Sequence, residues 1–242
     1  MDKVEIFIGK CYEEGLFTPQ SEIFFFHPLN QSLKGATQIA YEVGSEEGIV
    51  ALLCSYLSQK EKINDKEKAF LESLDIGYLS SECNVAEEEL EKIQKAVLKA
   101  KEVVIIAGLD LVYHQRSKNI QKILGILQKS YPLKSDFALL DSSCLEEIDE
   151  IGEVNGIIAY LQTKKNLKTP LLEASKQFAL VGKICDNSQV EVNFLDKSLL
   201  PLKADFRLCD NFKGNVGILW LPNFDEKTFC YKQITLKKCE VA

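Results

Sequence analysis

A short run of β-branched residues, Val-Val-Ile-Ile at positions 103–106, constrains the fold more than any other segment. Uninterrupted apolar character of this kind is typical of a strand buried on both faces of a parallel sheet. Helical periodicity precedes the run, with Leu90, Ile93 and Val97 on one face, and follows it over residues 117–129. A buried strand between two amphipathic helices predicts a parallel α/β layer.

Similar signals extend this pattern along the chain. Apolar runs predict strands at 4–9 and 22–27, and a helix is expected to begin after Ser45, where Glu46 and Glu47 suit the positive end of a helix dipole. A further helix is expected over 169–178. We expect one largely parallel sheet with helices on both faces, built from strands at 102–107, 137–140, 156–161 and 179–184.

The last part of the chain has a different character. Turn-forming residues recur after residue 185, and the segments between them are short and rich in β-forming residues, at 190–194, 216–221 and 229–236. This spacing is typical of small, mostly antiparallel β structures. We therefore expect an α/β domain over residues 1–185 and a small β-rich appendage over residues 186–242.

Charge and hydropathy exclude several classes of function. The formal net charge of −7 disfavours nucleic acid as the main ligand, because such binding needs a concentrated cationic field. No stretch reaches the roughly 18 apolar residues of a membrane span, and the first residues contain no apolar segment typical of a secretory signal. We expect a soluble, cytoplasmic protein with no direct membrane insertion.

Eight cysteines raise the question of a metal or redox centre. The closest pair, Cys230 and Cys239, is nine positions apart, and no two cysteines have C-x-x-C spacing. Iron–sulfur and structural zinc sites usually take two thiolates from one turn of chain, and His27 and His114 are the only histidines. We expect the cysteines to be buried free thiols, with no metal centre and no bound cofactor.

The loop after residues 102–107 is a candidate ligand crevice. Loops at the carboxyl ends of parallel strands commonly bind ligands, and this segment contains Asp110, His114, Arg116 and Asn119. His114 could act as an acid–base group and Arg116 as an anion clamp. Neither a glycine-rich phosphate loop nor a nucleophile elbow accompanies them. We therefore favour local turn and capping roles, with His114 at the rim.

A second candidate surface is a strip of lysines near the helix expected around residues 87–99: Lys92, Lys95, Lys99 and Lys101. Such a strip is usually a solvated face, because glutamates such as Glu88 and Glu91 lie four residues before a lysine and can pair with it. The same lysines could dock an acidic protein, because complementary charge raises the rate of association. Both interpretations stay open.

Three segments resemble one known family in order and spacing. They are residues 41–53 (Tyr-Glu-Val-Gly-Ser-Glu-Glu-Gly-Ile-Val-Ala-Leu-Leu), residues 74–90 (Leu-Asp-Ile-Gly-Tyr-Leu-Ser-Ser-Glu-Cys-Asn-Val-Ala-Glu-Glu-Glu-Leu), and Gly108-Leu109-Asp110 continuing through His114, Arg116, Lys118, Asn119 and Ile120. Together they resemble the molybdopterin-oxidoreductase-like domain found in an iron–sulfur subunit of bacterial NADH-quinone oxidoreductase (respiratory complex I). The resemblance covers about residues 22–140.

Several departures limit what the resemblance implies. The clustered cysteines of the family's N-terminal iron–sulfur region do not occur here, and a short, divergent tail replaces the long Gly/Asn/Gln-rich stretch that follows in the family. Cys83 lies where the family pattern is closer to serine, so it is not an inherited ligand. The family's domain binds no molybdenum cofactor as a rule, and nothing in this sequence restores one.

The resemblance implies a non-catalytic accessory subunit of a complex-I-like quinone oxidoreductase that lacks the NADH-oxidising module. The expected partners are the other peripheral-arm subunits, including that iron–sulfur subunit, and a flavodoxin or ferredoxin as electron donor. The complex would hold the chain at the inner membrane, and the chain alone should have no activity. Two alternatives stay open: a nucleotide- or flavin-binding oxidoreductase that uses the Gly108–Arg116 crevice, and a free-standing interaction module.

Metal analysis tests the interpretation of the cysteines. Because no two thiols have the spacing of a cluster or zinc ligand pair, we expect protein purified without oxygen to contain neither iron nor zinc in stoichiometric amount. Stoichiometric iron together with acid-labile sulfide would contradict this prediction.

Overall fold

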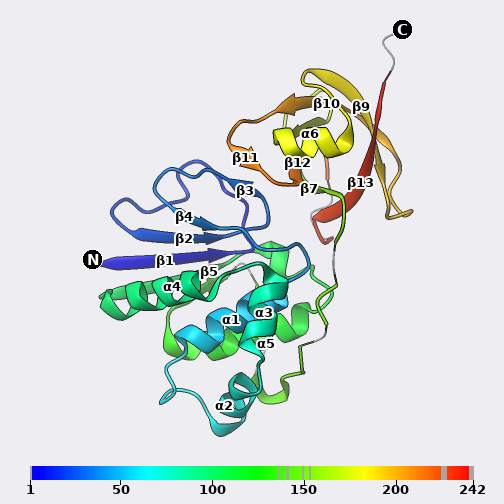
Figure 1. Cartoon of the computed structure of the whole chain (residues 1–242). Coiled ribbons are helices and arrows are strands. Elements are labelled where there is room, and N and C mark those ends of the chain that lie inside the picture. The colour runs from blue at the N-terminus through cyan, green and yellow to red at the C-terminus, as the bar shows by residue number, and fades with distance from the viewer. Residues whose placement is uncertain are drawn as a thin grey trace. The chain divides into compact units, whose positions relative to one another are not determined.

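The structure is a computed structural model that describes residues 2–135, 137–139, 142–148, 150–152, 154–224 and 228–239. The chain folds into two compact units (Figure 1). The first, here the α/β unit, comprises residues 1–27 and 33–153, and the second, the barrel unit, comprises residues 28–32 and 154–242. The division therefore falls after residue 153, and not after residue 185 as the sequence suggested.

A five-stranded parallel sheet forms the centre of the α/β unit, in the order β4-β2-β1-β5-β6. From β1 the chain first extends the sheet through β2 and β4, and later extends it on the other side through β5 and β6. The order therefore reverses between β1 and β5, and ligands commonly bind at the carboxyl ends of the strands flanking such a reversal. The strands are β1 (Lys3–Ile8), β2 (Glu22–Phe26), β4 (Thr37–Ile39), β5 (Glu102–Ala107) and β6 (Leu133–Ser135).

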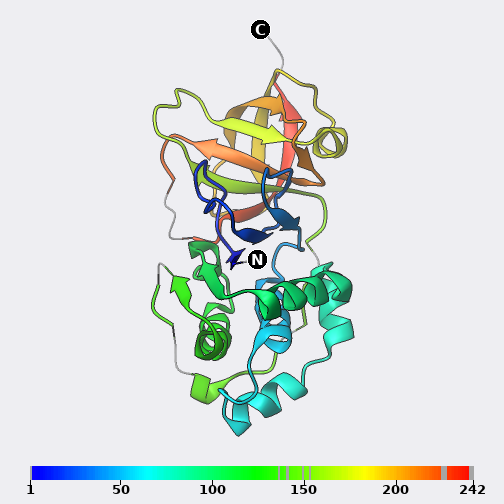
Figure 2. The same ribbon diagram turned by 90° about the vertical axis from the view of Figure 1, so that its left-hand side faces the viewer.

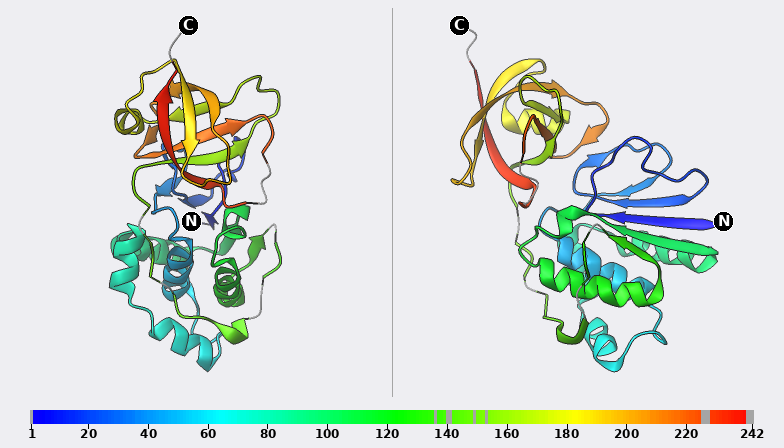
Figure 3. Two further views of the ribbon diagram at one scale, coloured as in Figure 1. Left: turned by 90° about the vertical axis from the view of Figure 1, so that its right-hand side faces the viewer. Right: turned by 180° about the vertical axis from the view of Figure 1, so that it is seen from behind.

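Helices cover one face of this sheet (Figure 3). Alternate side chains of β1, such as Val4, Ile6 and Ile8, point to this face and form one hydrophobic core with the apolar sides of α1, α4 and α5. The helices are α1 (Glu46–Leu57), α2 (Asp65–Glu72), α3 (Ile76–Cys83), α4 (Glu87–Lys99) and α5 (Ser117–Ser130), with short 3-10 turns η1 (Leu109–Leu111) and η2 (Ser142–Cys144).

The opposite face of the sheet is covered by aromatic side chains from a loop. Phe7 and Phe25 of the sheet pack there against Tyr12 and Phe17, which lie in the connection from β1 to β2. In the described residues of the α/β unit no helix covers this face, so the expectation of helices on both faces is wrong. The connection is only residues 9–21, and its two glycines and one proline disfavour a helix.

The barrel unit is a closed barrel of six strands in the order β10-β8-β12-β7-β13-β9 (Figure 2). The β7–β12 and β8–β10 pairs are parallel, and the remaining pairs are antiparallel. The strands are β7 (Ile157–Thr163), β8 (Leu171–Ala174), β9 (Ser188–Phe194), β10 (Leu202–Leu208), β12 (Val216–Leu221) and β13 (Tyr231–Lys238); the unit also contains helix α6 (Lys176–Gly182) and the short pair β3 (Asn30–Gln31) and β11 (Phe212–Lys213).

Three expected elements change place or type. Residues 156–161 do contain strand β7, but it belongs to the barrel, because an apolar run buried in a closed barrel has the same pattern as a central parallel strand. Strand β8 occupies the middle of the helix expected over 169–178. The strand expected over 179–184 lies largely in α6, which begins where the Ser175 hydroxyl accepts from the Phe178 N–H.

The remaining comparison concerns the end of the sheet. Residues 137–139 are not in a strand, residue 140 lies outside the described residues, and β6 occurs earlier, at Leu133–Ser135. The expected strands β1, β2 and β5, and the helices α1, α4 and α5, are confirmed. A mixed α/β fold with a helix-packed parallel sheet is therefore confirmed, and the barrel is an addition. Among the helices of the described residues, none has the length and apolar character needed to cross a membrane.

Candidate functional site

Two glycines bring the loops after β1 and β5 into direct contact at the order reversal of the sheet. A Cβ added to Gly108 would lie 2.0 Å from the carbonyl oxygen of Gly9. Gly9 itself has a φ of +62°, and a Cβ there would lie 2.6 Å from Cγ of Leu111, whose side chain is fully buried. Only glycine fits at both positions, and the two loops pack without space between them.

The backbone N–H groups of this junction are already bound. The N–H of Gly108 donates to Ile8 O at 2.8 Å, and the N–H of Asp110 donates to Gly9 O at 3.2 Å. Phosphate-binding loops work by offering such N–H groups to a ligand. Here the chain's own carbonyl oxygens accept them, so these groups are not available to an anion.

A carboxylate from α1 lies beside the first turn of α5, where a bound anion would be stabilised by the helix dipole. Glu47 is 4% exposed, and its oxygens accept from Nε of Arg116 at 3.1 and 3.3 Å and from Nδ2 of Asn119 at 2.6 Å. The Arg116 and Asn119 predicted for the crevice therefore hold an internal anion. Sequence reasoning treated Glu47 as a solvated residue at a helix start and missed this role.

Arg116 and Asn119 also hold the segment that follows β6. Arg116 donates to the Glu146 carboxylate at 3.0 Å and to Glu147 O at 2.7 Å, while Asn119 exchanges two hydrogen bonds with the backbone of Glu146. Asn119 is 1% exposed, and its side chain has partners on both its oxygen and its nitrogen. Both residues therefore tie chain segments together, and the arrangement is not that of an open anion clamp.

His114 is a buried, neutral imidazole. Its Nδ1 accepts the N–H of Arg116 at 3.0 Å, which leaves the ring proton on Nε2, 3.1 Å from Gly44 O. Burial lowers the pKa of His114, and the charge of Arg116 lowers it further against the bond to Gly44. His114 is 5% exposed, so it does not lie at the rim as expected. Protonating Nδ1 would break a backbone hydrogen bond, which disfavours an acid–base role.

Glu46 lies in the same buried cluster. Its side chain is fully buried, with Oε2 3.4 Å from Nε2 of His114, and neither oxygen has a hydrogen-bond partner of normal geometry among the described residues. Burial raises the pKa of Glu46 to about 8, and the Asp110 carboxylate adds to the rise, while nearby backbone groups oppose it. At pH 7 the side chain is therefore a neutral carboxylic acid. Asp110 is itself buried, 3.6 Å from Nε2 of His27.

The cysteines and histidines do not form a metal-binding group in the part of the chain that the structure describes. Cys54 and Cys83 are buried thiols whose pKa burial raises to about 12, so they are unreactive at neutral pH. Cys230 is also buried, whereas Cys144 and Cys185 are exposed. The expectation of buried thiols is therefore wrong for the last two.

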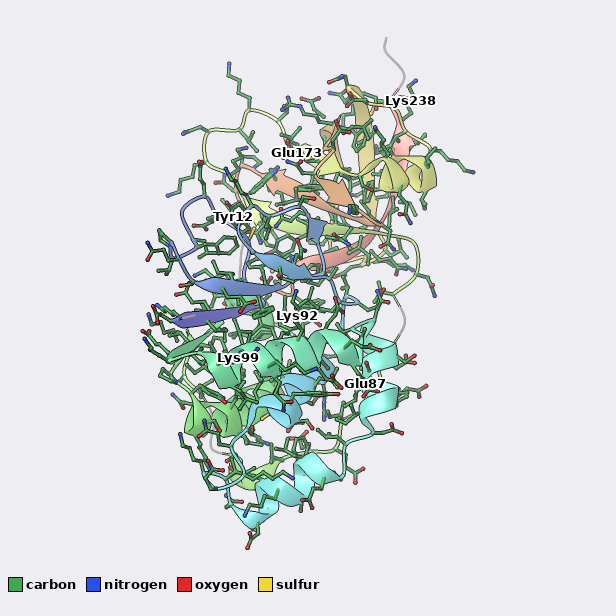
Figure 4. The ribbon with its side chains drawn as sticks, turned by 60° about the vertical axis from the view of Figure 1, so that its left-hand side comes forward. Tyr12, Glu87, Lys92, Lys99, Glu173 and Lys238 are labelled. Atoms are coloured by element: carbon green, nitrogen blue, oxygen red, sulfur yellow. The ribbon has the colours of Figure 1, made fainter. Side chains whose placement is uncertain are left out.

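The predicted lysine strip lies on and just after α4, as Figure 4 shows for Lys92 and Lys99. Two of its four members have carboxylate partners: Lys95 bonds Glu91 at 2.9 Å and Lys101 bonds Asp2 at 2.8 Å. A shallow groove on this helix is lined by Lys92, Lys95 and Lys99 and equally by Glu22, Glu88 and Glu91. The surface is therefore mixed in charge and is not a cationic patch.

The three segments that carry the resemblance meet at the buried cluster. Segment 41–53 supplies Glu46 and Glu47, segment 108–120 supplies His114 and Arg116, and segment 74–90 ends α3 at Cys83, whose carbonyl accepts the Glu42 N–H. A Cβ on Gly48 would lie 2.6 Å from Sγ of Cys83, so the contact between α1 and α3 is also tight. The resemblance therefore marks one packed centre of the α/β unit.

Replacing Gly108 tests the close contact of the two loops. Gly108→Ala should lower the free energy of unfolding by about 2–3 kcal/mol or more, because the new Cβ displaces backbone and not a flexible side chain. Gly77→Ala in α3 is the control, since its Cβ meets nothing closer than 3.7 Å; it should change stability by no more than about 1 kcal/mol. Denaturant unfolding measures both, and equal stability of the two variants would contradict the packing described.

Replacing Glu46 tests its neutral state. In the unfolded chain Glu46 ionises near its ordinary value of 4.5, whereas in the folded chain it stays protonated up to about pH 8. Its contribution to stability is therefore lost as pH rises from about 4.5 to about 8, by up to roughly 1.4 kcal/mol per unit. The stability of Glu46→Gln relative to wild type should rise across this range in chemical unfolding. A difference that does not change with pH would show that Glu46 is ionised when folded.

Comparison with known proteins adds no family to this description: neither a family model nor a curated protein matches the chain. The resemblance to the complex I iron–sulfur subunit therefore depends on the three quoted segments, and what the structure adds is that these segments lie together in one buried network.

Proposed function

We propose that the chain is a non-catalytic accessory subunit of a complex-I-like quinone oxidoreductase and that it helps to dock an acidic electron-donor protein of the flavodoxin or ferredoxin type. One observation carries the non-catalytic part: the crevice where a parallel sheet would bind a cofactor is filled by the chain's own groups. The N–H groups of Gly108 and Asp110 are bound to the loop after β1, and Glu47 lies beside the first turn of α5.

The sequence resemblance carries the choice of complex. The residues that resemble the complex I iron–sulfur subunit include Glu46, Glu47, His114, Arg116 and Asn119, which form the buried network of the α/β unit. A network of this kind stabilises a scaffold, and a scaffold without an open cofactor site suits a protein that acts through its surface. The peripheral-arm subunits, including that iron–sulfur subunit, are the proposed partners within the complex.

The alternative, a nucleotide- or flavin-binding oxidoreductase using the Gly108–Arg116 crevice, has less support. A nucleotide phosphate needs free N–H groups or an arginine, and here both are engaged within the chain. His114 could contribute acid–base chemistry only after losing its bond from the Arg116 N–H. The free-standing interaction module differs from our proposal only in its partners, and isolation of the assembled complex separates the two.

Two measurements test the proposal. A tagged full-length chain should co-purify with membrane-arm and peripheral-arm subunits, and cells lacking it should lose donor-dependent quinone reduction until the chain is restored. FMN or NADH at millimolar concentration should leave the melting temperature of the purified chain unchanged, since a ligand of the folded state would raise it. A chain that purifies free of the oxidoreductase contradicts the proposal, and a melting temperature raised by FMN favours the enzyme alternative.

A further inference from the structure

The two units carry charge of opposite sign. The barrel unit contains 13 lysines and arginines against 9 aspartates and glutamates, for a net charge of +4, whereas the α/β unit has 16 against 27, for a net charge of −11. The total of −7 conceals this partition. An acidic partner is therefore repelled by one unit and attracted by the other, whichever individual lysines it meets.

The most concentrated positive charge of the barrel unit lies in the loop between β7 and β8, residues 164–170, which extends away from the strands (Figure 2). Lys164, Lys165 and Lys168 are exposed, and the loop itself contains no carboxylate. In the described part of the chain none of these three lysines is in an ion pair. We call Lys164, Lys165 and Lys168 the basic loop.

The neighbouring side chains leave this charge uncompensated. The nearest strand carboxylate, Glu173, accepts from Nε1 of Trp220 at 2.7 Å and lies 4.0 Å from Arg207. Lys164 lies over the half-buried ring of Trp220, with Nζ 5.0 Å from its centroid. This contact orients one end of the basic loop, because an ammonium over an indole face is attracted to it.

The strip on α4 is a weaker candidate for the same role. Its groove has as many glutamates as lysines, and Lys95 and Lys101 are paired with carboxylates. It also lies on the unit with net charge −11. Charge complementarity therefore favours the basic loop over α4 as the first contact of an acidic protein.

We propose that the basic loop is the docking surface for the acidic donor protein, an inference that rests on the proposed function. A compact acidic protein fits better than nucleic acid, because a long polyanion also meets the field of the acidic unit. Lysines without arginine provide point charges for carboxylates and lack the bidentate geometry that favours phosphate. Lys164, Lys165 and Lys168 then raise the association rate and fix the orientation of the donor.

The experiment compares two triple variants of the full chain with the same total charge. Lys164→Glu/Lys165→Glu/Lys168→Glu changes the basic loop, and Lys92→Glu/Lys95→Glu/Lys99→Glu changes α4. Association with a purified flavodoxin is measured by stopped flow at increasing sodium chloride. We expect the loop variant to associate at least about tenfold more slowly than wild type at low salt, with the difference closing as salt screens the charges. The α4 variant should stay within about threefold of wild type.

Further variants and probes keep the outcomes separate. Lys165→Glu/Lys168→Glu leaves the Lys164–Trp220 contact intact and should retain most of the effect, which excludes local unfolding as its cause. Equal rates for loop variant and wild type, a larger loss in the α4 variant, no flavodoxin association by wild type, or tighter binding of a single-stranded oligonucleotide would each overturn the inference. Failure of the proposed function is seen independently, when the tagged wild-type chain does not co-purify with the oxidoreductase.

Discussion

The carboxylate of Glu47, buried beside the first turn of α5, is the interaction on which the α/β unit depends. It comes from α1 and is held by Arg116 and Asn119 of the α5 start, which also hold the segment containing Glu146. A buried charge is costly unless it is paired and hydrogen-bonded, and here the hydrogen bonds of Arg116 and Asn119 meet that requirement. Three separate parts of the chain are fixed by one anion that the chain supplies itself.

This internal anion explains why a sheet with the strand order of a cofactor-binding fold can act as a scaffold. A fold does not determine function, since function depends on the site. At this site the loops after β1 and β5 are in contact through Gly9 and Gly108, and the polar groups bind one another. Whatever the chain recognises must then do so through its exterior, where the two units differ in charge by sign.

The sequence predicted elements better than it predicted their assembly. Periodicity was enough for β1, β5, α1, α4 and α5, because each signal lies within the element. It could not distinguish β7 from a sheet strand, since burial inside a barrel produces the same apolar run. The burial of Glu46 and Glu47 was also missed. Glutamates at a helix start are usually solvated, and their partners His114 and Arg116 lie about 70 positions further along the chain.

The most direct test of the account is hydrogen exchange at the amides of Gly108 and Asp110, measured residue by residue by NMR. The account places these N–H groups in hydrogen bonds to Ile8 O and Gly9 O inside the chain. It therefore predicts strong protection in the free protein and no change when FMN or inorganic phosphate is added. Rapid exchange in the free protein that slows on addition of either ligand would show an open anion site, and would contradict the claim that the chain fills its own crevice.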